Sequence, residues 1–289
     1  MLVKELVVVS GKGGTGKTCI TASLAVLASD KVLVDCDVDA ANLHLLLEPR
    51  QQEKKPFYGL PKARIEKQDC LECALCASLC HFDAIRGFAV QPLACEGCGV
   101  CFHACPCNAV KMVDNLSGYL FLAQTNYGPL VYAQLAVAEG NSGKLVAAVR
   151  QQAREVAEKK GSALIITDGP PGIGCPVIAS LSGVDLALLV TEPTLSGLHD
   201  LERILALVEH FQEKAAVCIN KWDLNQGNSR EIEAISESKG VPVVGKIPYD
   251  PEVNKAVRRR LPVVRLNGGP AAREMVKMWD RLAQVLSLQ

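Results

Sequence analysis

The feature that most constrains the fold is one glycine-rich loop, Gly11-Lys12-Gly13-Gly14-Thr15-Gly16-Lys17-Thr18. An apolar run at 6–9 precedes it and helix-forming residues at 19–29 follow, so the sequence predicts a strand, a tight turn and a helix start. Glycines let successive backbone N–H groups point inward, and the helix N-terminus adds partial positive charge. The loop therefore predicts a phosphate cradle in which Lys17 reaches the β- and γ-phosphates and Thr18 binds Mg²⁺.

A second lysine, Lys12, directly follows the first glycine of the loop. With this lysine the stretch has the deviant P-loop form and resembles the MinD/ParA/Mrp/nitrogenase-iron-protein family of ATPases. The resemblance implies an α/β fold with a doubly wound, mostly parallel sheet of the P-loop NTPase type, and slow ATP hydrolysis. In that family the second lysine contacts nucleotide across a dimer interface, which implies a homodimer or a heterodimer with a related ATPase. The alternative for Lys12 is a solvated loop lysine.

Carboxylates follow two buried-looking strands. The run at 31–34 ends in Asp35 and Asp37, and the run at 163–167 ends in Asp168. Ligands of α/β sheets bind at the carboxyl ends of the strands, so we expect these side chains beside the loop. Asp168 fits the Walker B position, which holds Mg²⁺ through water. The resemblance implies that Asp35 joins the Mg²⁺ shell and that Asp37 orients the attacking water; the alternative for Asp37 is a helix cap. The predicted catalytic set is Lys12, Lys17, Asp37 and Asp168.

Two later segments bear on the nucleotide base. A predicted strand at 215–219 ends in Asn220-Lys221-Trp222-Asp223, which matches the N-K-x-D guanine reader of GTPases. In the family that the loop resembles, the asparagine alone is usually needed and it reads adenine. The segment at 247–251 looks like the base-flanking loop of that family, with Pro248 and Asp250 in the binding set. We favour ATP and ADP over GTP, because the family context outweighs a four-residue motif.

Nine of the thirteen cysteines lie between Cys70 and Cys107, and eight of them repeat the C-x2-C-x2-C-x3-C spacing of bacterial ferredoxins. In that pattern the fourth cysteine of each run ligates the other cluster. One [4Fe–4S] cluster is thus predicted to take Cys70, Cys73, Cys76 and Cys105, and the other Cys95, Cys98, Cys101 and Cys80. Zinc is disfavoured because it does not require the tandem third and fourth cysteines. Disulfides are disfavoured in a cytoplasmic protein. Cys107 is interpreted as a spare thiol.

The cysteine runs interrupt the ATPase pattern. The chain as a whole resembles MinD-superfamily ATPases with an inserted small α+β ferredoxin-like domain that holds two clusters. We therefore expect an ATPase domain made of residues 1–60 and 113–289, and a cluster domain at 61–112. The segment at 49–61 is polar and contains prolines, which predicts a linker out of the ATPase domain.

The chain after the cysteines is expected to rejoin the ATPase sheet. Strands are predicted at 119–122 and 130–133, a turn at 140–143 and a helix from 142 to 158. The last predicted helix, 270–286, has one apolar face. Its polar face is not strongly basic, so core packing is favoured over a membrane surface.

Composition narrows the possible partners and location. The 31 basic and 31 acidic residues balance, so bulk charge does not favour nucleic acid or an anionic membrane. No apolar run approaches the about 20 residues that span a bilayer. No signal peptide is visible before the loop, and a cytoplasmic protein is expected.

Three functional hypotheses follow. The first is nucleotide-gated electron transfer, in which ATP closes a dimer and the clusters reduce or oxidise a redox partner protein. The second is a cluster carrier of the Mrp type, which is ranked lower because each cluster has four ligands within one chain. The third is a MinD- or ParA-like positioning ATPase whose clusters sense redox state.

Overall fold

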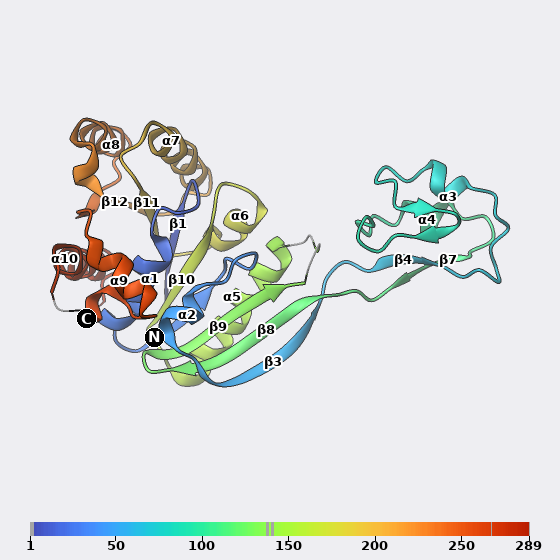
Figure 1. The fold of residues 1–289 in the computed structure, drawn as a ribbon, viewed down its shortest axis with the longest axis horizontal. Helices are drawn as coiled ribbons and strands as arrows, with labels where there is room; N and C mark the ends of the chain where they lie inside the picture. The colour runs from blue at the N-terminus through green and yellow to red at the C-terminus, as the bar shows by residue number, and fades with distance from the viewer. Residues whose placement is uncertain (1–2, 137–138, 140–141, 267, 289) are drawn as a thin grey trace.

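A computed structural model describes residues 3–136, 139, 142–266 and 268–288 (Figure 1). Its main feature is a nine-stranded sheet. The strands lie in the order β13 (Val243–Ile247), β12 (Ala215–Asn220), β11 (Leu186–Thr191), β1 (Lys4–Ser10), β10 (Leu164–Pro171), β2 (Lys31–Asp35), β9 (Gly128–Leu135), β8 (Leu116–Thr125) and β3 (Arg50–Tyr58). Pairing is parallel from β13 to β9 and antiparallel for β9–β8 and β8–β3. The predicted mostly parallel α/β sheet is confirmed.

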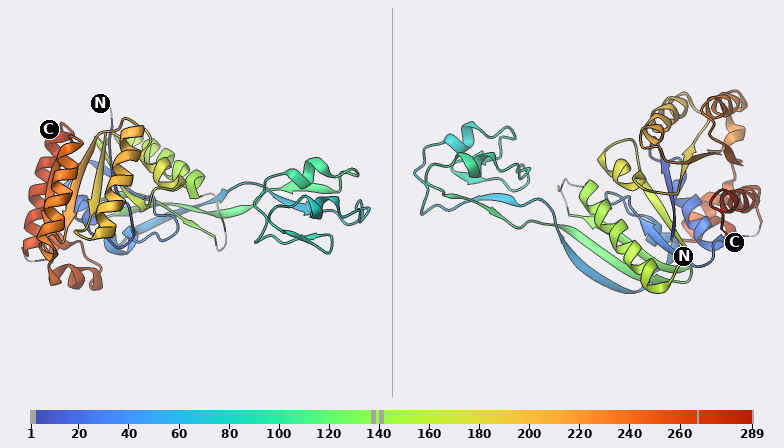
Figure 2. Two further views of the ribbon diagram at one scale, coloured as in Figure 1. Left: turned by 90° about the horizontal axis from the view of Figure 1, so that it is seen from above. Right: turned by 180° about the vertical axis from the view of Figure 1, so that it is seen from behind.

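Helices cover both faces of the sheet (Figure 2). They are α1 (Lys17–Leu27), α2 (Leu43–Leu47), α5 (Ser142–Lys160), α6 (Cys175–Leu181), α7 (Leu195–His210), α8 (Gln226–Ser238), α9 (Pro251–Arg258) and α10 (Pro270–Val285). Successive residues of a strand face opposite sides. In β1, Leu6 and Val8 join the core under α1 and α10, whereas Val7 and Val9 join the core under α6 and α7. A continuous apolar run is therefore what a doubly covered central strand requires.

The predicted linker at 49–61 is wrong, because most of it forms the edge strand β3. This strand pairs antiparallel with β8, and Lys54 lies opposite Phe121. The Lys54 ammonium lies 3.6 Å from the centre of the Tyr119 ring. Lysines and a proline, here Pro56, are typical of edge strands because they block pairing with another chain. The same polar composition that suggested a linker thus marks the border of the sheet.

The other predicted elements after the cysteines are confirmed. Strands β8 and β9 contain the segments 119–122 and 130–133, and α5 contains the helix predicted from 142. Residues 140–141 of the predicted turn lie outside the described part of the chain. In α10, Met275 and Leu282 are buried against the sheet, which confirms core packing. Among the described residues, no helix has the length and apolar character needed to cross a membrane.

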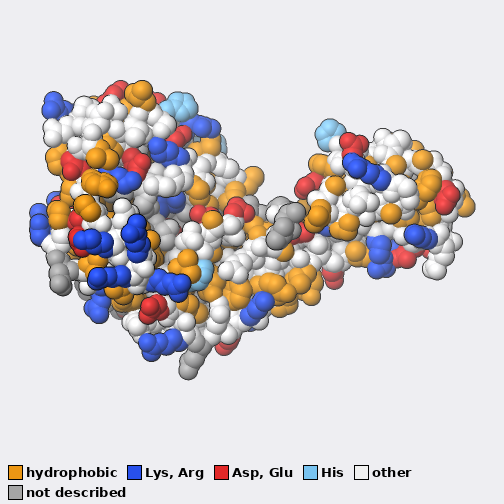
Figure 3. Space-filling view, viewed as in Figure 1, with side chains coloured by type: hydrophobic (Ala, Val, Ile, Leu, Met, Phe, Trp, Pro, Cys, Tyr) orange, Lys and Arg blue, Asp and Glu red, His pale blue; other side chains and the backbone are white. Residues whose placement is uncertain are grey.

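The segment that contains the nine clustered cysteines lies at the end of a narrow arm (Figure 1). Strands β3 and β8 lead into the two-stranded sheet of β4 (Lys62–Ile65) and β7 (Val110–Val113). We call residues 61–112 the cysteine module. It also contains α3 (Leu75–Ser78), β5 (Ile85–Arg86), β6 (Ala89–Val90) and α4 (Val100–Ala104). Its own small core consists of Ala63, Cys76, Ile85 and Val110. Apolar side chains are scattered over its visible face (Figure 3).

A polar junction ties the base of the arm to the main sheet. Lys62 Nζ lies 2.7 Å from Oε1 of Glu139 and donates a further hydrogen bond of 2.9 Å to the Pro92 carbonyl of the module. Oε2 of Glu139 accepts hydrogen bonds from Asn115 Nδ2 and Ser117 Oγ, at 2.7 and 3.0 Å. Burial opposes ionisation of Glu139, but these donors hold the pKa of its carboxyl group below its usual range.

Candidate functional site

The glycine-rich loop joins the end of β1 to α1, which begins at Lys17. Gly14 and Gly16 have φ angles of 81° and 93°, in the left-handed region that favours glycine. A Cβ atom on Gly16 would lie 2.5 Å from Nδ2 of Asn220, so close packing also requires glycine there. The loop is thus a tight turn that ends at the N-terminus of a helix, the arrangement that binds anions in other proteins.

Hydroxyl groups of α1 meet the aspartate that ends β10. Thr18 Oγ1 donates a hydrogen bond of 2.7 Å to Oδ2 of Asp168, and Thr21 Oγ1 donates one of 3.0 Å to Oδ1. Burial raises the pKa of the Asp168 carboxyl group to about 6, although Thr18, Lys17 and Thr21 each lower it. The sequence interpretation missed Thr21. Its position three residues after Thr18, on the same side of a helix, was the available signal.

Asp35 organises the segment after β2. It is fully buried and lies opposite Asp168 in the β2–β10 pair. Its carboxylate accepts hydrogen bonds of 3.0 Å from the backbone N–H groups of Asp37, Asn42 and Leu43. Burial raises the pKa of Asp35 well above its usual range, and the charge of Asp168 raises it further. Two carboxyl groups that resist ionisation, those of Asp35 and Asp168, therefore lie side by side at the carboxyl ends of β2 and β10.

Asp37 and Lys17 complete this charged group. Asp37 is half-buried. Burial raises the pKa of its carboxyl group, and the Lys17 ammonium lowers it. Lys17 is itself 6% exposed. Because it also lowers the pKa of Asp168, its positive charge acts on both carboxylates. The structure thus brings together Lys17, Thr18, Asp35, Asp37 and Asp168.

The segment after Asp168 lies close to the loop. A Cβ atom on Gly169 would lie 2.5 Å from Cγ1 of Val9, so the close approach of β10 to β1 requires glycine. Gly172 has a φ angle of 94°, and its N–H donates a hydrogen bond of 2.9 Å to the Ser10 carbonyl. The Gly172 N–H is therefore bound to the strand that leads into the loop.

The N-K-x-D segment has structural partners of its own. Asn220 Nδ2 donates a hydrogen bond of 2.7 Å to the Thr15 carbonyl of the loop. Oδ1 of Asp223, the guanine-reading position of the motif, accepts one of 2.7 Å from the Tyr249 N–H. Asn220 thus holds the glycine-rich loop in place through its side-chain amide. The N-K-x-D motif alone does not predict this contact.

Pro248 and Asp250 follow β13 beside this segment. Pro248 is half-buried, and Asp250 is 6% exposed. The Asp250 carboxylate caps α9 by accepting a hydrogen bond of 2.9 Å from the Glu252 N–H. Its second oxygen accepts one of 3.3 Å from the Ala271 N–H. The carboxylate therefore joins α9 to α10, and its contact with a base stays a prediction.

Lys12 extends away from the buried charges. Its ammonium donates hydrogen bonds to Thr194 Oγ1 and Ser196 Oγ, at 3.1 and 2.9 Å, in an exposed position at the start of α7. Within the described chain this lysine thus has two neutral hydroxyl partners, and it lies apart from the group around Lys17.

Comparison with known proteins assigns this arrangement to a family. The sequence model of the CobQ/CobB/MinD/ParA nucleotide-binding domain matches residues 6–263. The chain belongs to this family. An uncharacterized protein of Methanocaldococcus jannaschii is 31% identical over 264 residues, which cover 90% of each chain. The septum site-determining protein MinD of Bacillus subtilis is 25% identical over 270 residues, 90% of this chain and 81% of that protein.

Solved structures agree on the fold. The cell division ATPase MinD of Pyrococcus furiosus has a TM-score of 0.61 at 20% identity, covering 98% of this chain and 100% of that one. MinD of Pyrococcus horikoshii, solved in complex with Mg-ADP, has a TM-score of 0.61 at 19% identity and full coverage of both chains. The fold is thus that of MinD, in agreement with the assignment to the CobQ/CobB/MinD/ParA family. Neither the family description nor these names mention iron–sulfur clusters, so the cluster domain stays a prediction.

The cysteine module of this MinD/ParA-type protein gathers its thiols in two groups. The first group, Cys80, Cys95, Cys98 and Cys101, lines one small hollow together with Phe82. In the second group, burial raises the pKa of the Cys76 thiol, and the neighbouring thiols of Cys105 and Cys70 raise it further. Cys73, the remaining predicted ligand, is exposed. The seven thiols in these groups are divided as the crossed spacing predicts.

Backbone donors point at three of these sulfur atoms. The N–H groups of Glu72, Ala84 and Ala109 lie 3.4, 3.4 and 3.3 Å from the Sγ atoms of Cys70, Cys80 and Cys105, respectively. Hydrogen bonds to sulfur stabilise thiolate ligands. Among the described residues, no group of three or more His, Cys, Asp or Glu side chains could hold a metal ion. A cubane differs from a single ion, because each of its thiolates binds a separate iron atom.

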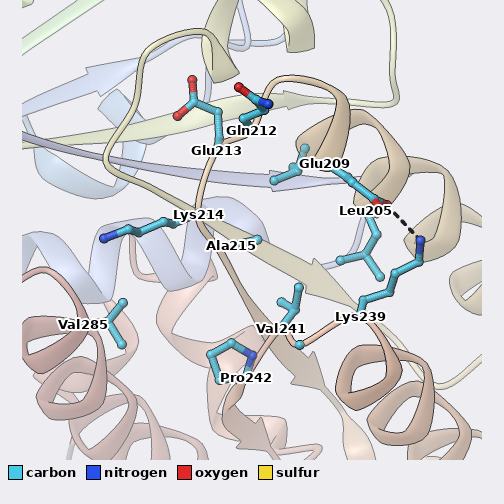
Figure 4. Close-up of a pocket in the computed structure, with 12 residues that line it drawn as sticks. Leu205, Glu209, Gln212, Glu213, Lys214, Ala215, Lys239, Val241, Pro242 and Val285 are labelled. Carbon is cyan, nitrogen blue, oxygen red and sulfur yellow. Dashed lines mark hydrogen bonds and ion pairs between the residues drawn. The ribbon is translucent and has the colours of Figure 1, made fainter.

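A separate hollow of about 510 Å³ lies far from this chemistry (Figure 4). It is lined by the ends of α7 and α8 and by the start of β12, including Leu205, Lys214 and Val241. These positions mark the amino ends of the parallel strands, whereas the glycine-rich loop follows the carboxyl end of β1. Open α/β sheets bind their ligands at the carboxyl ends. The hollow is therefore not the nucleotide site.

Proposed function

We propose that this protein binds ATP and Mg²⁺ at the loop Gly11–Thr18 and hydrolyses ATP slowly as a nucleotide-switched dimer. The observation that carries the proposal is the hydrogen bond between Thr18 and Asp168 beside the buried ammonium of Lys17. Mg²⁺ prefers such oxygen ligands, and the lysine suits phosphate oxygens. Among the described residues, Thr15 Oγ1 is buried without a hydrogen-bond partner, which fits a cradle that receives one more polar group.

Different side chains of the site are proposed to bind Mg²⁺, to orient the attacking water and to bind adenine. Asp168 and Thr18 hold Mg²⁺, and Asp35 positions the segment that carries Asp37 through three backbone hydrogen bonds. Asp37, half-buried near the Lys17 charge, orients the attacking water. The proposed binding set for adenine is Asn220, Pro248 and Asp250, of which Asn220 also braces the loop.

The Gly172 N–H acts as the switch. It donates to the Ser10 carbonyl at 2.9 Å, and it cannot donate fully to a γ-phosphate at the same time. Binding of ATP therefore exchanges one acceptor for the other, and hydrolysis reverses the exchange. A loop with two discrete acceptors is the kind of bistable element that nucleotide state controls.

Lys12 is proposed to act across the dimer. Its ammonium is exposed and has two neutral hydroxyl acceptors, Thr194 and Ser196. A phosphate oxygen is a stronger acceptor for an ammonium than a neutral hydroxyl is, because the phosphate carries negative charge and attracts the ammonium as an ion pair. A nucleotide bound to a second copy of the chain can therefore displace these hydroxyls.

Two lysine variants test the ATPase proposal. Lys17→Ala should weaken ATP binding by about 100-fold or more, because it removes a buried charge-assisted contact. Lys12→Ala is the matched control, since it should retain ATP binding while losing ATP-dependent dimerisation and hydrolysis. Calorimetry and light scattering measure the two effects. Unchanged ATP affinity in Lys17→Ala would overturn the proposed site.

A second proposal concerns the cysteine module. We propose that it holds two [4Fe–4S] clusters, one on Cys70, Cys73, Cys76 and Cys105 and the other on Cys80, Cys95, Cys98 and Cys101. Support comes from the hollow lined by four of these cysteines and from the N–H groups directed at sulfur. The described cysteines are all free, which fits a reducing compartment such as the cytoplasm. When bound, the clusters supply one-electron chemistry.

The role of such clusters is less directly supported than the ATPase. The family assignment favours a MinD/ParA-like switch, in which the clusters sense redox state, over electron transfer to a redox partner protein. Anaerobic purification with iron and sulfide analysis tests whether the clusters exist. Reduction of the clusters should change the ATPase rate if they are sensors. If they transfer electrons, ATP should change the rate at which a redox partner is reduced.

A further inference from the structure

We propose that Cys107 donates an S–H···S hydrogen bond to the cluster ligand Cys105 and thereby gives the two clusters different reduction potentials. The inference rests on the proposed clusters and goes beyond them, because it assigns a task to the one module cysteine that is not a ligand. Its basis is the distance of 3.6 Å between the Sγ atoms of Cys107 and Cys105.

The two halves of the module offer an internal comparison. Residues 80–84 and 105–109 form the same turn after the fourth cysteine of each run. In both, the fourth residue donates its N–H to the cysteine carbonyl at 3.3 Å and has a positive φ, 48° for Asp83 and 54° for Asn108. In both, the fifth residue, Ala84 or Ala109, donates its N–H to the cysteine sulfur.

The second residue of the turn is His81 in one half and Pro106 in the other, but the difference that places a donor beside sulfur lies at the third residue. This residue is Phe82 in the first half and Cys107 in the second. Phe82 is 41% exposed and offers no polar hydrogen, so Cys80 has only its backbone donor among the described residues. Cys105 has the same backbone donor and, in addition, the Cys107 thiol. Cys80 and Cys105 thus have equivalent backbone N–H donors to sulfur, but only Cys105 has a side-chain donor as well.

The direction of the bond follows from ligation. A cysteine that binds iron is a thiolate and has no proton to donate, so Cys105 can only accept. Cys107, which binds no iron, keeps its proton and donates it. Reduction adds negative charge to the cluster, and a donor to its sulfur stabilises that charge. The cluster bound by Cys105 should therefore be reduced first, and a single added electron should reside on it.

Cys107 is a positioning residue in this account, because it touches a ligand and not the cluster itself. The readout must therefore be the reduction potential. The full-length protein, purified with both clusters under anaerobic conditions, is titrated with dithionite and followed by electron paramagnetic resonance. The wild type should show two separate one-electron steps.

Three variants test the assignment. Cys107→Ala should lower the potential of the higher step and bring the two steps together. Cys107→Ser, which keeps a hydroxyl donor, should retain most of the separation. Phe82→Cys is the reciprocal variant and should raise the potential of the lower step. If Cys107→Ala leaves both steps in place or moves both equally, the inference fails while the clusters stand.

Two other outcomes also decide the matter. Loss of one cluster in both Cys107→Ala and Cys107→Ser would make Cys107 a ligand, which overturns its role as a donor. A wild-type protein without iron and sulfide would overturn the cluster proposal itself, and this inference with it. The iron analysis therefore separates failure of the proposed function from failure of the hydrogen bond.

Discussion

The ATPase body and the cysteine module use different means to become ordered. In the body, the central strands β1, β2 and β11 are covered on both faces, and side chains such as Leu6 and Leu33 are fully buried. In the module six apolar residues are buried, and four of them, Ala63, Cys76, Ile85 and Val110, pack into one cluster. Of the seventeen large apolar side chains exposed in the described chain, seven belong to the module: Leu71, Leu75, Leu79, Phe82, Leu93, Val100 and Phe102.

The difference in buried core between the body and the module indicates how far the stability of each depends on a bound ligand. Apolar burial is the dominant stabilising term in a large domain, and the body has three large buried clusters. We therefore expect the body to fold without ligand. A unit of about fifty residues with so small a core usually needs disulfides or metal. The described cysteines are free, and in our proposal the two clusters supply this stabilisation. In the nucleotide site, by contrast, the ionised forms of Asp35 and Asp168 are unfavourable, because burial raises the pKa of both carboxyl groups.

Removing iron should separate the two regions most strongly. We expect chelation of the clusters to unfold residues 61–112 and to leave the body folded, because metal-binding free energy is folding free energy in such small units. Limited proteolysis should then cleave within the module and spare the segments on either side. A Cys175→Ser variant, altered outside the module, should behave like the wild type. Equal protease resistance of the iron-free module and the body would contradict the comparison.

Neutralising Asp168 should stabilise the nucleotide-free body. Burial raises the pKa of Asp168 in the folded protein to about 6 from an ordinary value of 3.8. Its contribution to stability is therefore present below about pH 4 and is lost as the pH rises through about 6. Asp168→Asn should raise the free energy of unfolding at pH 7 by about 1–3 kcal/mol, with little effect at pH 4.

Thermal unfolding without Mg²⁺ measures this effect. Asp39→Asn is the control, because Asp39 is an exposed carboxylate near the same group, and its charge raises the pKa of Asp37. Added Mg-ADP should stabilise the wild type and not Asp168→Asn. A loss of stability in Asp168→Asn at pH 7 without Mg²⁺ would show that the carboxylate supports the fold more than it strains it.

The junction between the two regions should give the smallest effect. Burial opposes ionisation of Glu139, but hydrogen bonds from Lys62, Asn115 and Ser117 hold the pKa of its carboxyl group low. Its contribution is therefore present at neutral pH and is lost as the pH falls below about 4. Glu139→Gln should destabilise the base of the arm by about 1 kcal/mol, since it weakens a single ion pair.

Hydrogen exchange is the appropriate measurement for this local change. Amides of β4 and of the segment 113–117 should exchange faster in Glu139→Gln, and the melting temperature of the body should stay constant. Glu66→Gln, which alters a more exposed ion pair with Arg64 in the module, is a matched control. A global shift in melting temperature would mean that body and module form one cooperative unit.

Much of the body could be predicted from local patterns. The loop between Gly11 and Thr18, the strand ends at Asp35 and Asp168, and the helix face of α10 all appear as short motifs or simple periodicities. Burial on both faces makes a central strand a continuous apolar run, so the sequence shows it directly. The cysteine spacing likewise predicts which thiols share a cluster, because in the bacterial ferredoxin pattern the fourth cysteine of each run ligates the other cluster.

Only the tertiary structure decided the features that depend on distant residues. It turned a polar, proline-containing stretch into the edge strand β3, because pairing with β8 satisfies its backbone and an edge tolerates charge. It placed Asn220 under a loop 205 residues earlier in the chain, and it bound the Gly172 N–H to Ser10. At short range, the turn after Cys105 brought the thiol of Cys107 within 3.6 Å of that of Cys105, which the spacing alone did not show. Local sequence encodes periodicity and spacing, whereas the partner of a given polar group is settled only when the chain has packed.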